Sequence, residues 1–220
     1  RKLVGDDHEI TIDCNQGYSA QDLLETTPYF EEVNVALIEE PIPARDGTGA
    51  VGGSQGAVAL NELVPEALAI LGKEQAFIIR HQTGKKQAEA TQNRYKTLGI
   101  DDANVQAFIT DMAEAYAWAD LVICRSGALT VSELAAAGVA SVLVPYPFAV
   151  DDHQTANGRY LSDEGAAILC QQAGMTSENL AQTLKPLLSR PKLLQMATIA
   201  RKLAQPKATA TVAQFCTRQE

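Results

Sequence analysis

The sequence contains no long hydrophobic run. Nowhere among its 220 residues do about 18 apolar residues follow one another, which is the length that a membrane-spanning helix needs. With 46% apolar and 20% charged residues, the composition is that of a globular protein with a sizeable core, and it excludes a wholly disordered chain. No charged and then apolar leader opens the sequence, so we expect a cytoplasmic location.

Basic residues and cysteines are also scarce. The 18 Lys and Arg residues are scattered and outnumbered by 27 Asp and Glu, which gives a formal net charge of −9 and argues against binding to nucleic acid. The four cysteines lie far apart, without the paired spacing of a zinc site. We therefore expect buried free thiols in a reducing compartment.

Short apolar runs alternate with helix-like segments along the whole chain. We predict strands at residues 9–13, 35–39, 76–81, 105–108, 121–124, 141–144 and 167–170. We predict helices at residues 20–30, 57–71, 85–98, 112–117, 129–137, 152–164, 177–189 and 191–203, with Ser177 as an N-cap and Gly138 at a helix end. This alternation predicts an α/β fold: a Rossmann-like parallel sheet with helices on both faces.

Two polar stretches follow or border predicted strands. Residues 52–57, Gly-Gly-Ser-Gln-Gly-Ala, open a helix, and their glycines would let the backbone approach a diphosphate. They lack the Lys-Ser/Thr ending of a P-loop, and a plain glycine-rich loop is the alternative. His81 lies at the carboxyl end of a predicted strand, where ligands of open α/β folds bind, although a structural role is the simpler reading for a lone histidine.

The most informative stretch is residues 125–133, Arg-Ser-Gly-Ala-Leu-Thr-Val-Ser-Glu, between a buried strand and an Ala-rich helix. Its turn would present backbone N–H groups to a phosphate, and Glu133 could accept hydrogen bonds from ribose hydroxyls. The alternative is that Glu133 only interacts with the helix dipole. Further on, Gln154 and Asn157 share a helix face and carry amides suited to sugar hydroxyls.

From about residue 51 to 216 the chain resembles the C-terminal, donor-binding half of the MurG family, glycosyltransferases of the GT-B type that add N-acetylglucosamine to lipid I in peptidoglycan synthesis. The resemblance rests on the order and spacing of Gly-Gly-Ser-Gln-Gly-Ala at 52–57, His-Gln-Thr-Gly at 81–84, Phe-Ile-Thr-Asp-Met at 108–112, Ala-Trp-Ala-Asp at 117–120, the stretch at 125–133, and Asp-His-Gln-Thr-Ala-Asn at 152–157.

The resemblance implies a site for UDP or UDP-N-acetylglucosamine, with no cofactor and no metal. It implies that backbone near Ile109 and Met112 reads uracil, that Glu133 holds the ribose, and that Gln154 and Asn157 reach the sugar. The glycine loops would hold the diphosphate. The implied binding residues are Gly53, Ser54, Gln55, Gly56, His81, Ile109, Met112, Arg125, Ser126, Gly127, Ala128, Leu129, Thr130, Glu133, Gln154 and Asn157.

Residues 1–48 depart from this family. They resemble a strand-helix-strand fragment of the enolase-superfamily barrel, in which the positions of Asp13 and Glu39 bind magnesium. The third carboxylate and the lysine base of that family are missing, so these two carboxylates are expected to be vestigial. We therefore predict two parts, an enolase-like segment at 1–48 and a MurG-like nucleotide-sugar-binding domain at 49–220.

The junction between the two parts shortens a central strand. Residues 48–51 are too few and too glycine-rich to form it, so we expect residues 35–39, or the whole fragment, to dock on the domain in its place. An exposed strand edge there would favour self-association. Two functions remain open: a donor-binding domain that lacks its acceptor half and does not complete transfer, or a recombined or artificial chimera without selected activity.

Overall fold

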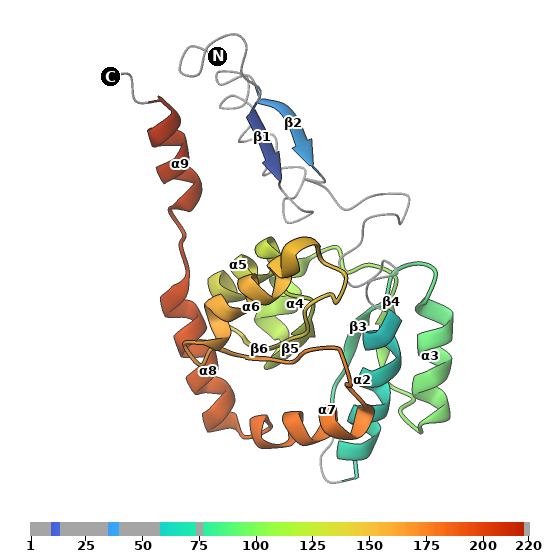
Figure 1. The fold of residues 1–220 in the computed structure, drawn as a ribbon. Coiled ribbons are helices and arrows are strands. Elements are labelled where there is room, and N and C mark those ends of the chain that lie inside the picture. Colours follow the sequence, from blue (N-terminus) through green and yellow to red (C-terminus); the bar gives the residue numbers. More distant parts are fainter. Residues whose placement is uncertain (1–9, 14–34, 40–57, 74–76, 218–220) are drawn as a thin grey trace.

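The computed structural model describes residues 10–13, 35–39, 58–73 and 77–217 (Figure 1). The predicted helix at 20–30 and the glycine loop with Gly53, Ser54, Gln55 and Gly56 lie outside these residues. The strands are β1 (Ile10–Asp13), β2 (Val35–Glu39), β3 (Arg80–Gln82), β4 (Asn104–Gln106), β5 (Leu121–Cys124), β6 (Ala140–Leu143) and β7 (Ala167–Leu169).

Helices follow the strands of the core in regular alternation. They are α2 (Val58–Leu71), α3 (Ala88–Thr97), α4 (Met112–Trp118), α5 (Ala128–Ala137), α6 (His153–Ser162), α7 (Ser177–Leu184), α8 (Arg190–Leu203) and α9 (Ala208–Thr217), with short 3₁₀ turns η2 (Val150–Asp152) and η3 (Lys185–Leu187). The predicted helix at 177–189 is therefore divided, because Pro186 has no N–H to continue the α-helical ladder. Helix α9 was not predicted.

All the described strands pair in parallel, and their pairings form three separate groups. β3 pairs with β4, β5 pairs with β6 and β6 with β7, while β1 pairs with β2. The α/β class with parallel strands is confirmed. Among the described residues no strand pairing joins β3 to β5, so the single sheet that alternation suggested is not continuous there. In the region predicted as a strand at 76–81, β3 begins at Arg80.

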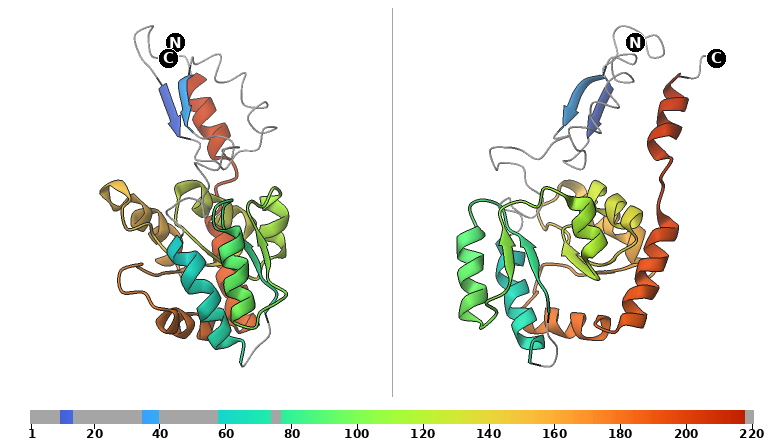
Figure 2. Two further views of the ribbon diagram at one scale, coloured as in Figure 1. Left: turned by 90° about the vertical axis from the view of Figure 1, so that its right-hand side faces the viewer. Right: turned by 180° about the vertical axis from the view of Figure 1, so that it is seen from behind.

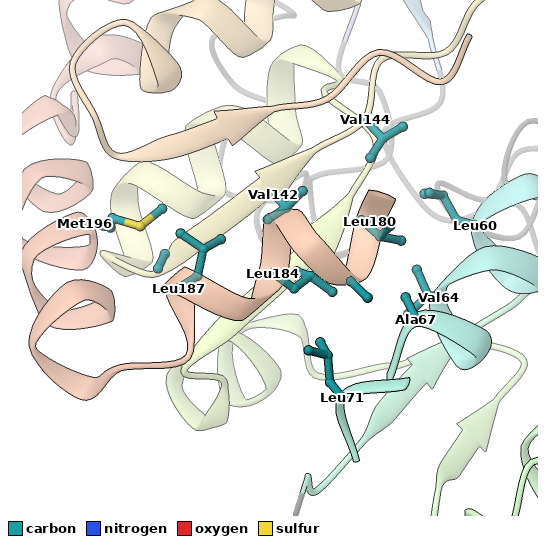
Figure 3. Close-up of a cluster of buried hydrophobic side chains, with 12 residues drawn as sticks. Leu60, Val64, Ala67, Leu71, Val142, Val144, Leu180, Leu184, Leu187 and Met196 are labelled. Carbon is teal, nitrogen blue, oxygen red and sulfur yellow. The ribbon is translucent and has the colours of Figure 1, made fainter. Parts of the chain in front are cut away.

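Helices cover both faces of the sheet that contains β6. Val142 points into a core with α2 and α7, where Leu60, Val64 and Leu184 meet (Figure 3). The next residue, Leu143, points the other way, into a second core formed with α5, α6 and α8. Successive side chains of a strand alternate between its faces, so every residue of β6 is buried.

Local signals fix the ends of the helices that shape the site. Gly138 ends α5 as expected, with a left-handed φ of 69° and its N–H bonded to the carbonyl of Leu134. The predicted N-cap of α7 is one residue off: Thr176 accepts from the N–H of Asn179, and the side chain of Asn179 accepts from the N–H of Thr176. Ser177 lies inside the first turn. The helix begins at the position where Thr176 and Asn179 form two reciprocal hydrogen bonds, whereas Ser177 as the N-cap was expected to form one.

The N-terminal strands pair only with each other among the described strands, with Asp13 opposite Glu39. They lie beyond the α/β core in all three views (Figures 1 and 2). The predicted replacement of a core strand by residues 35–39 is thus not the pairing that the structure has. The division into two parts at residue 48 and the docking of the fragment remain predictions.

Candidate functional site

Several of the described residues that were predicted to bind a nucleotide sugar follow the carboxyl ends of β3, β5 and β6. Hydrogen bonds join the turn after β5 to α6, the helix that follows β6. The Ser126 hydroxyl donates to the carbonyl of Gln154 at 2.7 Å, and Asn157 Nδ2 donates to the carbonyl of Ser126 at 3.2 Å. Gln154 Oε1 accepts from the N–H of Tyr146 at 2.9 Å. The structure therefore brings Ser126, Gln154 and Asn157 together, although they are up to 31 residues apart.

The turn itself opens α5 with backbone groups. Gly127 is the N-cap residue and offers no side chain to accept from the first helical N–H groups. Val131 N–H is the first to bond back, to the carbonyl of Gly127 at 3.0 Å. No acidic residue lies in the first turn, so Ala128, Leu129 and Thr130 begin the helix at an end that attracts anions. The helix begins one residue earlier than predicted.

Glu133 lies one turn further along α5 and is held by a tyrosine. The hydroxyl of Tyr116, on α4, donates to Glu133 Oε2 at 2.9 Å. Burial raises the pKa of the Glu133 carboxyl, and the hydrogen bond from Tyr116 opposes that rise. Burial and then the Glu133 charge raise the pKa of Tyr116, so its hydroxyl keeps its proton and remains a donor. This arrangement is compatible with both predicted roles of Glu133, contact with a ribose and interaction with the helix dipole. An interaction with the dipole alone would not require the hydrogen bond from Tyr116.

Arg125 is 6% exposed, and its guanidinium is engaged by the protein. Nη1 donates to the carbonyls of Val144 and Pro145, each at 3.1 Å, and Nη2 donates to Gln172 Oε1 at 2.5 Å. The guanidinium also lies 5.6 Å from the ring centre of Tyr146. Arg125 therefore ties together the segments that leave β5, β6 and β7. Its predicted contact with a ligand stays a prediction.

His81 lies in a polar network that the sequence did not reveal. Asn61 Nδ2 donates to the carbonyl of Thr83 at 3.2 Å, which leaves Asn61 Oδ1 to accept from His81 Nε2 at 3.0 Å. The other ring nitrogen, Nδ1, then accepts from the Tyr95 hydroxyl at 3.0 Å. Burial lowers the pKa of His81 to about 4, so the ring is neutral at pH 7. This geometry favours the structural alternative for His81.

The predicted uracil-reading segment follows β4. The N–H of Ile109 donates to Gln82 Oε1 at 2.8 Å, so the strand-end glutamine of His-Gln-Thr-Gly orders this segment. Asp111 caps α4 by accepting from the N–H of Glu114 at 2.8 Å, and Met112 is the first residue of that helix. Ile109 and Met112 both border a large cavity between β3 and β5.

The described part of the chain has neither a cluster of metal ligands nor a membrane-spanning helix. Within residues 10–13, 35–39, 58–73 and 77–217, no three His, Cys, Asp or Glu side chains gather as metal ligands would. None of the helices in these ranges is both long and apolar enough to cross a membrane. Cys124 and Cys170 are free thiols, and burial raises the pKa of Cys124 to about 12.

Two family models match this chain, and their matches overlap at residues 50–66. Residues 50–212 match the model of the glycosyltransferase family 28 C-terminal domain, and residues 1–66 match that of the enolase C-terminal domain-like family. A UDP-N-acetylglucosamine--N-acetylmuramyl-(pentapeptide) pyrophosphoryl-undecaprenol N-acetylglucosamine transferase of Marinobacter nauticus is 51% identical over 189 residues, covering 83% of this chain and 52% of that protein. The transferase of the same name from Pseudomonas fluorescens is 49% identical over 203 residues, covering 90% of this chain and 57% of the other.

Two solved glycosyltransferase structures are also similar to this chain. The crystal structure of Acinetobacter baumannii MurG superposes with a TM-score of 0.72 and 39% identity, covering 97% of this chain and 67% of that one. WaaG, a glycosyltransferase involved in lipopolysaccharide biosynthesis, superposes with a TM-score of 0.55 at 20% identity and shows only that the fold is shared. The chain spans about half the length of the curated relatives it matches.

Proposed function

Because the chain belongs to the glycosyltransferase family 28 C-terminal domain family, we propose that it binds UDP-N-acetylglucosamine as the donor half of a MurG-like transferase. The observation that carries this proposal is the hydrogen-bonded cluster of Ser126, Gln154 and Asn157 beside the uncapped start of α5. It offers N–H groups for a diphosphate next to amides suited to a sugar.

The Glu133 carboxylate supplies the ribose contact in this proposal. Tyr116 leaves Glu133 Oε1 free of the hydrogen bond that occupies Oε2, and a carboxylate oxygen can accept from a ribose hydroxyl. The leaving diphosphate would be stabilised by the N-terminus of α5 and by donors of the glycine loop at 52–57. Transfer to lipid I requires an acceptor half, so we propose binding without turnover for this chain alone. A cytoplasmic location also remains a proposal.

Calorimetric titration with UDP and 2′-deoxy-UDP tests the ribose contact. A hydrogen bond to a charged group contributes about 1.5–3 kcal/mol, so we expect the wild-type chain to bind UDP about 10- to 100-fold more tightly than the deoxy analogue. Glu133→Ala should remove this preference, while Glu164→Ala, an exposed carboxylate away from the cluster, should keep it. Equal losses for both nucleotides in Glu133→Ala would refute the ribose contact.

The second candidate, a recombined or artificial chimera without selected activity, is favoured by the enolase-like match at residues 1–66. Thermal unfolding distinguishes the two functions. A ligand at 100 times its dissociation constant adds about 2.7 kcal/mol of stability. No stabilisation at millimolar UDP or UDP-N-acetylglucosamine would support the chimera and contradict the donor-binding proposal.

A further inference from the structure

Arg80, on β3, contacts two side chains of α4. Its Nη1 donates to Glu114 Oε2 at 2.6 Å, and its Cζ lies 4.2 Å from the ring centre of Trp118. A cation within about 6 Å of an aromatic ring centre is attracted to the face of the ring. Arg80 therefore connects β3 to α4, although the family resemblance implies no role for it.

The two contacts lie on one face of α4. Glu114 and Trp118 are four residues apart, so they are neighbours on the helix surface. Tyr116 is two residues from each, about 200° around the helix. Its hydroxyl donates to Glu133 Oε2 on α5 at 2.9 Å. Helix α4 is therefore held from opposite sides, by Arg80 on β3 and by Glu133 on α5.

Helix α4 is short and buries little of its own surface. It has seven residues, and isolated helices shorter than about 12–15 residues are marginal in water. Ala115 is buried, and the other residues of this helix are at least partly exposed. A helix that buries so little apolar area depends on its polar contacts for a fixed position.

Strand β3 also holds the segment that precedes α4. Arg80 and Gln82 are two residues apart on this strand, so their side chains point to the same face of it. Gln82 Oε1 accepts from the N–H of Ile109 at 2.8 Å. The strand therefore holds residues 109–118 at two points, the segment predicted to read uracil and the helix that carries Tyr116.

We propose that Arg80 is a positioning residue for ribose recognition. It holds α4 through Glu114 and Trp118, and this keeps the Tyr116 hydroxyl in place. That hydroxyl in turn orients Glu133. The inference rests on the proposed function, because it assigns Arg80 to the same UDP site, and it requires no contact between Arg80 and the ligand.

Calorimetric titration with UDP and 2′-deoxy-UDP tests this role. Arg80→Gln removes both contacts with α4, and we expect the preference for UDP to fall about 3- to 10-fold, with little change in the affinity for 2′-deoxy-UDP. A general weakening of the fold would instead lower both affinities equally. The matched control Arg94→Gln breaks an ion pair of 2.7 Å with Glu66, between α3 and α2, and should keep the preference.

The outcomes separate this inference from the proposed function. A preference that Glu133→Ala abolishes and Arg80→Gln leaves intact would overturn the role of Arg80 and retain the ribose contact. No preference in the wild type would overturn both. An equal fall in Arg94→Gln would also overturn the role of Arg80. If Arg80→Gln does not fold, Glu114→Gln, which removes only the ion pair, decides: a fall in the preference supports the proposal, and no fall overturns it.

The fluorescence of Trp118 provides a test that needs no ligand. Trp118 is the single tryptophan of the chain, so its emission is observed alone. The Arg80 guanidinium lies over the ring, and Arg80→Gln should therefore increase the quenching of this emission by acrylamide. Arg94→Gln should leave the quenching unchanged. Unchanged quenching in Arg80→Gln would show that Arg80 does not hold Trp118 and would overturn the proposal.

Discussion

Removal of the Tyr116 hydroxyl is the sharpest test of how the site is built. Tyr116→Phe keeps the ring on α4 and deletes only the donor that reaches Glu133 Oε2 at 2.9 Å. The carboxylate would then stay half-buried without that donor, and its pKa, already raised by burial, should rise further. A raised pKa means that the folded state disfavours the charged carboxylate. The loss of stability in Tyr116→Phe should therefore be present at neutral pH and should vanish below the ordinary carboxyl pKa, where Glu133 is protonated in both the folded and the unfolded state.

The expected loss of stability in Tyr116→Phe follows from the type of hydrogen bond that is removed and from the exposure of Glu133. A hydrogen bond to a charged group stabilises a protein by about 1.5–3 kcal/mol, and partial exposure of Glu133 favours the lower part of that range. We expect Tyr116→Phe to lower the free energy of unfolding by about 1.5–2 kcal/mol at pH 7. The control Tyr160→Phe removes an exposed, neutral hydrogen bond to the carbonyl of Leu203 and should cost less, about 0.5–1 kcal/mol.

A double-mutant cycle isolates the interaction. Urea unfolding at pH 7 is measured for the wild type, Tyr116→Phe, Glu133→Gln and the double variant, and the coupling should be about 1 kcal/mol or more. A coupling below about 0.3 kcal/mol, the usual error of additivity, would show that Tyr116 does not hold Glu133. Titration of Tyr116→Phe with UDP and 2′-deoxy-UDP then reports whether the lost positioning also weakens ribose recognition.

Two further predictions concern residues that shape the site from outside it. Gly138→Ala should lower the free energy of unfolding in urea by about 1–2 kcal/mol, because φ is 69° and the new Cβ would lie 3.0 Å from Arg201 Cβ. The control Gly99→Ala, with a φ of 78° and nothing within 4 Å of the new Cβ, should show the cost of the backbone conformation alone. An equal loss of stability in both variants would show that the contact with Arg201 adds nothing. His81 has its pKa lowered to about 4 by burial, so folding favours the neutral ring and stability falls as pH drops below the ordinary value of about 6.5. We expect a loss of about 1 kcal/mol between pH 7 and 5.5 that His81→Gln abolishes and the exposed His153→Gln does not; the same pH dependence in His81→Gln would contradict the buried neutral ring.

The sequence predicted the features that depend on near neighbours in the chain. Strand, turn and helix follow one another at residues 121–137 as their apolar period and Gly138 indicate. The partners of the candidate site residues escaped prediction, because Asn61, Tyr95 and Tyr116 meet His81 and Glu133 only after distant segments pack. A buried polar residue in the apolar run of α2 was the one available signal for Asn61.

The pairing partners of the strands were not predicted from the sequence. Residues 48–51, which are few and glycine-rich, lie outside the described residues, so the predicted loss of a central strand stays a prediction. Residues 35–39 were expected in the sheet of the core, but in the structure they form β2 and pair with β1. Apolar periodicity alone does not distinguish these partners.

Hydrogen bonds within the protein join Ser126, Gln154 and Asn157 and hold the two amides in fixed orientations. A ligand arriving at this side of the domain would find its amides already oriented and would immobilise few additional side chains. The association rate constant should therefore be limited by diffusional encounter. At constant viscosity, osmolytes that stabilise the fold should change this rate constant little. Differences in affinity among related nucleotide sugars should then come mainly from the dissociation rate constant.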